Sequence, residues 1–128
     1  MRWLLDTNVF IDAFAGEANA VKAMKHAREA NAEWVGFSAI TRLEVLGFAG
    51  LSAADEKGLR ELLAEFAETE VTSDVIEAAI RLRRSIRIKT PDALIAAAAL
   101  VHRAELVTRN NTDFRHVPGL VVINPVNL

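Results

Sequence analysis

Short apolar runs alternate along the chain with segments in which apolar residues recur at helical spacing. The short runs predict buried strands at residues 4–5, 34–37, 105–108 and 121–124, with a further short strand at 70–72. Helical spacing is found in residues 9–14, 19–31, 39–48, 52–66, 75–86 and 90–101. Because strands alternate with helices throughout, the pattern predicts a parallel sheet packed between two layers of helices.

Several helix starts are also visible in the sequence. Ser38, Ser52 and Ser73 each precede a helical segment, where a serine hydroxyl can accept a hydrogen bond from a free backbone N–H. Pro91 suits the first turn of a helix, because the N–H that it lacks has no partner there. The helix that follows is apolar on every side over residues 93–101, and we therefore expect it to be deeply buried.

Size and charge restrict the possible classes of protein. A chain of 128 residues fits one domain, here residues 1–128, with a single hydrophobic core. It has no cysteine, which excludes disulfides and thiolate chemistry and fits a cytoplasmic protein. Its longest apolar run, residues 93–101, is too short to span a bilayer. The formal net charge of −2 requires any phosphate-binding surface to be local or assisted by a metal ion.

Four acidic residues stand near the ends of the predicted elements, and each has an ordinary structural explanation. Asp6 follows the first strand and can cap the next helix, while Glu44 can belong to the solvated face of its helix. Asp92 opens the apolar helix, where the helix dipole favours a carboxylate by roughly 0.3–1 kcal/mol. Asp113 follows three polar residues and fits a turn.

Taken together, the four acids share a placement that capping does not require. In a parallel sheet the strand ends lie along one edge, and the helix that Asp92 opens starts on the same edge because it runs antiparallel to the strand it leads into. The acids are therefore predicted to converge there. Converging carboxylates repel one another unless a cation binds among them, and Mg²⁺ and Mn²⁺ prefer oxygen ligands. Such a site can activate a water molecule and stabilise a phosphoryl transition state.

The segments around these acids resemble a known family. They read, in order, Leu4-Leu5-Asp6-Thr7-Asn8-Val9-Phe10-Ile11-Asp12, Thr41-Arg42-Leu43-Glu44, Lys89-Thr90-Pro91-Asp92-Ala93-Leu94-Ile95-Ala96 and Thr108-Arg109-Asn110-Asn111-Thr112-Asp113-Phe114. This order is similar to that of PIN-domain nucleases, particularly the VapC-type toxins of bacterial and archaeal toxin–antitoxin pairs. The resemblance covers essentially the whole chain.

The resemblance implies a three-layer α/β/α sandwich whose parallel five-stranded sheet has the order 3-2-1-4-5. It implies an Mg²⁺- or Mn²⁺-dependent endoribonuclease that cleaves single-stranded or structured RNA, such as tRNA or ribosomal RNA, and that is paired with a cognate antitoxin and often forms a homodimer. The catalytic, metal-binding acids implied are Asp6, Glu44, Asp92 and Asp113, with Asp6 and Asp92 as the principal ligands. Hydrogen-bonding residues around them are implied at Thr7, Asn8, Thr108 and Asn110.

Basic residues are concentrated in the segment that leads into Asp92. Their ordinary interpretation is a solvated helix face, and the functional one is a track for the RNA backbone. The predicted RNA contacts are Arg84, Arg87, Lys89, Arg109 and Arg115. The three histidines are not spaced as a metal-binding trio. His116 is interpreted as a surface loop residue, although it could approach a phosphate near the active site.

Alternative functions remain open at this point. A receiver-like signalling domain also gathers acids beyond a parallel sheet, but such domains have adjacent acids after the first strand and a lysine after the last. Here Leu5 precedes Asp6, and Asn124 and Pro125 follow the last strand. A nuclease fold kept only for protein binding is disfavoured because all four acids are present. A housekeeping or defence nuclease without an antitoxin is the remaining alternative.

Overall fold

A five-stranded parallel sheet forms the centre of the computed structural model, which describes all residues from 1 to 128. Its strands are β1 (Arg2–Leu5), β2 (Trp34–Ser38), β3 (Ala67–Thr69), β4 (Glu105–Val107) and β5 (Val122–Ile123). They lie in the order β3-β2-β1-β4-β5, and every neighbouring pair is parallel. The predicted α/β/α architecture and its strand order are confirmed.

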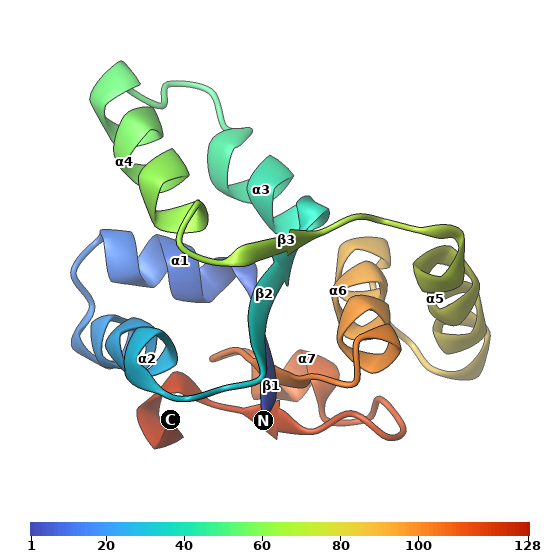
Figure 1. Ribbon diagram of the computed structural model, residues 1–128. Coiled ribbons are helices and arrows are strands. Elements are labelled where there is room, and N and C mark those ends of the chain that lie inside the picture. The colour runs from blue at the N-terminus through green and yellow to red at the C-terminus, as the bar shows by residue number, and fades with distance from the viewer.

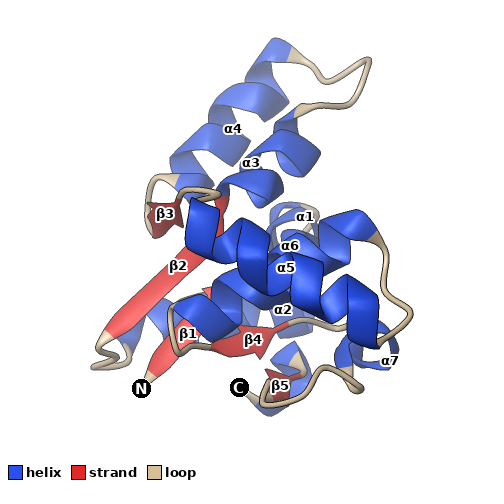
Figure 2. Cartoon of the chain, turned by 90° about the vertical axis from the view of Figure 1, so that its right-hand side faces the viewer, coloured by secondary structure: helices blue, strands red, loops and turns tan.

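Helices cover both faces of this sheet. They are α1 (Thr7–Phe14), α2 (Ala18–Glu29), α3 (Ala39–Leu46), α4 (Ala53–Leu63), α5 (Ser73–Ser85), α6 (Thr90–Val101) and the short α7 (Asn111–Phe114), and a 3-10 turn follows at Pro125–Asn127. In Figure 1, α1 and α2 lie to one side of the sheet, and α5 and α6 lie to the other. The pair α3 and α4 projects from the upper end of the molecule in both views (Figures 1 and 2).

Alternation of side chains along the strands explains the two helical layers. Trp3 and Leu5 point into a core shared with α1, α2 and α4, whereas Leu4 points into a core shared with α5 and α6. The same alternation separates Leu106 from Val107 in β4. Successive side chains of a strand face opposite sides of a sheet, so this central sheet requires helices on both faces.

The apolar helix α6 is buried as its composition predicts. Ala93, Ala96, Ala97 and Ala99 have no exposed surface, so the helix packs closely against the sheet, α5 and α3. This burial fixes the position of its first turn, which carries Asp92. None of the helices combines the length and the apolar composition that crossing a membrane would require.

Two local predictions are corrected by the structure. The third strand is Ala67–Thr69, not residues 70–72, because the backbone of β3 pairs with β2 at Gly36. A Cβ atom at position 36 would lie 2.5 Å from the carbonyl oxygen of Ala67, so only glycine permits this approach. The cap of α5 is Thr72, whose hydroxyl accepts a hydrogen bond from Val75 N, and Ser73 is already helical. The predicted caps Ser38 and Ser52 are confirmed.

Candidate active site

The carboxyl edge of the sheet begins with Asp6, which directly follows β1. Its Oδ1 accepts a hydrogen bond of 2.8 Å from the backbone N–H of Thr7 and thereby caps α1. The backbone N–H of Asp6 itself donates to the carbonyl oxygen of Val107 at the end of β4. Only 7% of the residue is exposed, so its carboxylate is held at the junction of two strands and a helix.

Thr108, the residue after β4, orients this carboxylate. Its hydroxyl is buried, donates to Asp6 Oδ2 at 2.9 Å, and accepts from Asn8 Nδ2 at 2.9 Å and from Asn110 N at 3.0 Å. The single proton and both lone pairs of the hydroxyl are therefore engaged. Asn8 Nδ2 also lies 3.3 Å from Asp6 Oδ2. Asp6 is thus held in one orientation by residues that follow the ends of β1 and β4.

Glu44 lies on the exposed face of α3 and is joined to Asp6 through Thr7. The Thr7 hydroxyl donates to Glu44 Oε1 at 2.7 Å, while the Thr7 backbone N–H binds Asp6. The hydroxyl of Thr41, which is fully buried, lies 3.1 Å from that of Thr7. One threonine therefore contacts two of the four acids.

The other two acids, Asp92 and Asp113, are carried by α6 and α7. Asp92 is the third residue of α6 and is partly buried, and its carboxylate accepts no hydrogen bond from another residue. Asp113 lies on α7 and accepts a 2.6 Å hydrogen bond from Asn110 Nδ2. The amide of Asn110 thus holds Asp113, as Thr108 holds Asp6.

Burial and repulsion between like charges raise the pKa values of two of the acids, Asp6 and Asp92. Burial raises the pKa of Asp6 to about 6, and the charges of Asp92 and Glu44 add to the rise, although hydrogen bonds from Thr7 and Thr108 oppose it. Burial also raises the pKa of Asp92, and repulsion from Asp113 and Glu44 adds to the rise, while the charge of Lys89 opposes it. None of the five ion pairs of the protein includes any of these acids. The four negative charges are therefore close enough to interact and lack a compensating ion pair.

The chemistry of these side chains fits a hard divalent cation. Every potential ligand is a carboxylate or hydroxyl oxygen, which is the donor set that Mg²⁺ and Mn²⁺ prefer. As the side chains stand, no group of three or more acidic or histidine residues is close enough together to hold an ion. The acids thus form an open cluster, and this suits Mg²⁺, which usually keeps several water molecules and binds few carboxylates.

Two of the basic residues predicted to bind RNA lie beside this cluster. Arg87 and Lys89 line a pocket of about 480 Å³ together with Asp92 and Asp113. Arg84 instead lines a separate groove between α5 and α6. The two groups therefore face different surroundings although they are close in sequence.

The other two predicted RNA contacts are engaged with protein groups. Arg109 Nε lies 2.6 Å from Asp12 Oδ2 in an ion pair on the surface. Arg115 Nε donates to His116 Nε2 at 3.3 Å. The ion pair reduces the net charge that Arg109 can offer to a phosphate.

Sequence reasoning missed some residues at this edge. Thr41 is the first residue of the motif that ends at Glu44. No feature of the sequence indicated that its buried hydroxyl would contact Thr7. Arg83 and Thr112 also line the pocket beside Asp92. His116 lines it too, although the sequence favoured an ordinary surface position for this histidine. Their convergence depends on the packing of α7 against α6, which local patterns do not reveal.

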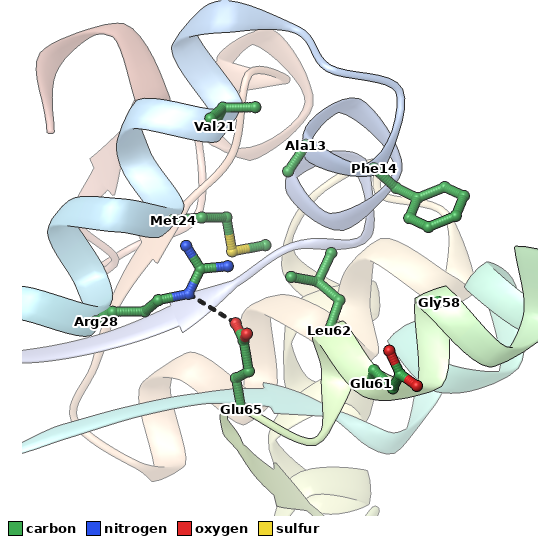
Figure 3. Close-up of a pocket in the computed structure, with 9 residues that line it drawn as sticks. All are labelled: Ala13, Phe14, Val21, Met24, Arg28, Gly58, Glu61, Leu62 and Glu65. Atoms are coloured by element: carbon green, nitrogen blue, oxygen red, sulfur yellow. Dashed lines mark hydrogen bonds and ion pairs between the residues drawn. The ribbon is translucent and has the colours of Figure 1, made fainter.

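A second groove, between α1, α2 and α4, has a different character. Figure 3 shows that Met24 and Leu62 form part of its lining, with Phe14 and Val21 nearby. The one ion pair there joins Arg28 and Glu65, with Nε and Oε2 2.7 Å apart (Figure 3). None of the four acids lines this groove, so the catalytic candidate is the cluster at the carboxyl edge.

Comparison with known proteins identifies the class to which this fold and this arrangement of acids belong. The family model of the PIN domain matches residues 3–120, and the chain therefore belongs to the PIN-domain family.

Individual relatives point to one branch of that family. Ribonuclease VapC19 of Mycobacterium tuberculosis is 32% identical over 122 residues, which make up 91% of this chain and 95% of the relative. A chain of a toxin–antitoxin complex from Klebsiella pneumoniae is 37% identical, with a TM-score of 0.79 and 98% of both chains covered. FitAcB from Neisseria gonorrhoeae gives a TM-score of 0.77 at 27% identity, with 98% of this chain and 99% of that chain covered.

Proposed function

We propose that this protein is a divalent-metal-dependent endoribonuclease of the VapC type. The observation that carries the proposal is the convergence of Asp6, Glu44, Asp92 and Asp113 at the carboxyl edge, with raised pKa values for Asp6 and Asp92 and no ion pair among the four. Negative charge concentrated in this way is stabilised by a cation. The relationship to ribonuclease VapC19 supports RNA as the substrate.

Each acid has a proposed part in the site. Asp6 and Asp92 are the principal ligands for Mg²⁺ or Mn²⁺, and Glu44 and Asp113 complete the acidic cluster. When bound, the metal supplies Lewis-acid activation of water and stabilises the charge of the phosphoryl transition state. Thr108 and Asn8 hold the Asp6 carboxylate, and Thr7 and Asn110 hold Glu44 and Asp113, so that the ligands need little reorganisation.

The biological role that fits these relatives is that of a toxin held inactive by a cognate antitoxin. The similar chain from Klebsiella pneumoniae was found in a toxin–antitoxin complex, and its coverage of 98% leaves little of this chain without a counterpart. We further propose that the protein forms a homodimer, as is common in the family, and that its RNA targets are tRNA or ribosomal RNA. The alternative is a nuclease without an antitoxin, which no neighbouring gene product would inhibit.

An RNA cleavage assay tests this function. The purified protein is expected to cut single-stranded RNA with Mg²⁺ or Mn²⁺ present, to stop when EDTA is added, and to resume when the metal is restored in excess. Addition of the protein encoded by a short reading frame next to its gene is expected to abolish cleavage. Cleavage that continues in EDTA would contradict the metal-dependent mechanism. Cleavage that no neighbouring gene product inhibits would support the nuclease without an antitoxin.

A further inference from the structure

The pocket beside the acidic cluster carries charge of both signs. It lies where the end of α5, the connection to α6, and α7 meet. Its volume is about 480 Å³. Two acids of the cluster form part of its wall, and the remaining charged or titratable lining comes from basic side chains. The acids are Asp92 and Asp113, and the basic side chains are Arg83, Arg87, Lys89 and His116.

Two of the four basic side chains, Arg87 and Lys89, have no ion-pair or hydrogen-bond partner, although the charge of Lys89 is near enough to lower the pKa of Asp92. Arg87 and Lys89 are exposed and take part in no ion pair, although two carboxylates share their pocket. Arg83 differs, because its Nη1 donates to the hydroxyl of Thr90 and so joins the end of α5 to the start of α6. The two unpaired cations thus stand on a segment that is fixed at both ends by helices.

A polynucleotide backbone fits a pocket that has metal-binding acids on one wall and free cations on another. Its phosphates repeat along the chain, so that one phosphate placed at the metal-binding acids brings its neighbour toward the adjacent wall. Arginine can bind a phosphate through two parallel N–H groups, and lysine supplies a compact positive charge. Nε2 of His116 accepts a hydrogen bond from Arg115 Nε, so Nδ1 is the ring nitrogen that is left to contact a phosphate.

We propose that Arg87 and Lys89 form a subsite for the phosphate next to the scissile one, with His116 at its far wall. This inference rests on the proposed ribonuclease function and adds positioning residues to it. The subsite orients the RNA backbone so that the scissile phosphate meets the acidic cluster. The chemistry recognised is a phosphate diester within the RNA, or a phosphate monoester at its 5′ end, and the test separates the two.

The test pairs changes in the protein with changes in the RNA. Single methylphosphonate linkages, which lack the negative charge, are placed in turn at each position around the cleavage site of a single-stranded oligonucleotide. In the wild-type protein, a methylphosphonate at one position next to the cleaved bond is expected to lower kcat/KM by about tenfold, the loss typical of one charged hydrogen bond. In Arg87→Gln/Lys89→Gln, the unmodified RNA is expected to show a similar loss, and the same methylphosphonate is expected to have no further effect.

A matched double variant controls for general electrostatics. Arg81→Gln/Lys22→Gln also removes two exposed positive charges, but neither residue lines the pocket. It is expected to cleave the unmodified RNA at nearly the wild-type rate and to keep the methylphosphonate sensitivity. Oligonucleotides with a 5′-phosphate and a 5′-hydroxyl are compared to separate the two phosphate sources. If the sensitivity depends on the 5′-phosphate alone, the subsite binds an RNA end.

The outcomes separate this inference from the function on which it rests. If Arg87→Gln/Lys89→Gln remains as sensitive to every methylphosphonate as the wild-type protein, and the wild-type protein cleaves RNA normally, the subsite is wrong and the proposed ribonuclease function is retained. If the wild-type protein cleaves no RNA with Mg²⁺ or Mn²⁺, the proposed function is wrong and the subsite with it. Because both substituted side chains are exposed, unchanged thermal melting is expected for the variant.

Discussion

Asp92→Asn is expected to lower the rate of Mg²⁺-dependent RNA cleavage by about a thousandfold, which corresponds to roughly 4 kcal/mol of transition-state stabilisation. Asparagine keeps the size of the side chain but removes the anionic charge that a metal ligand needs at this position. The fold is expected to persist, because the Asp92 carboxylate accepts no hydrogen bond from another residue and its charge is repelled by Asp113 and Glu44. Initial rates with saturating Mg²⁺ measure the effect.

Asp74→Asn is the matched control for this variant. Asp74 is also an aspartate in the first turn of a helix, here α5, but it lies outside the acidic cluster. Its substitution is expected to leave the cleavage rate unchanged and to affect stability by only a few tenths of a kcal/mol, since the residue is exposed. Near wild-type cleavage by folded Asp92→Asn would remove Asp92 from the site.

The stability of the metal-free protein is expected to fall as the pH rises from about 4 to about 7. Burial raises the pKa of Asp6 from its ordinary value of 3.8 to about 6 in the folded protein, so the folded state binds the proton more tightly than the unfolded chain does. Asp6 is protonated in both states below the lower pKa, and above the higher one it must be ionised in a buried site. A shift of about two pKa units corresponds to about 3 kcal/mol of unfolding free energy.

Asp6→Asn is expected to remove this part of the pH dependence. Its absolute stability is less informative, because in either orientation of the amide the Nδ2 group would face a donor, the Thr7 N–H or the Thr108 hydroxyl, at a cost of about 1–3 kcal/mol. Urea unfolding in EDTA at several pH values measures the difference between the two proteins. An equal pH slope in wild type and variant would show that Asp6 titrates normally in the folded protein.

The layers of the fold could be predicted from sequence because the pattern that specifies them is local. Leu4 and Leu5 are buried on opposite faces of one strand, and residues 93–101 of α6 are all apolar and so have no polar side to expose. The acidic cluster could be located because parallel strands place their ends on one edge, so that positions in sequence translate into positions in space. This rule was sufficient to place Asp6 and Asp92 at the same edge without knowledge of tertiary contacts.

The basic surroundings of the site could not be predicted in the same way. Arg84 and Arg87 are three residues apart in sequence, yet they line different concavities, because α5 ends between them at Ser85. The pairing of Arg109 with Asp12 joins α1 to the loop after β4, and nothing local signals it. Likewise, β3 is placed by the close approach of the chain to Gly36 and not by its own composition.

Mn²⁺ binding followed by electron paramagnetic resonance tests whether the acids at the carboxyl edge bind a divalent metal. The wild-type protein is expected to bind Mn²⁺ at about neutral pH and to release it to competing Mg²⁺. Asp92→Asn is expected to lose this binding, whereas Asp74→Asn is expected to retain it. Mn²⁺ binding by Asp92→Asn with the affinity of the wild-type protein would show that the acids at the carboxyl edge do not form the metal site.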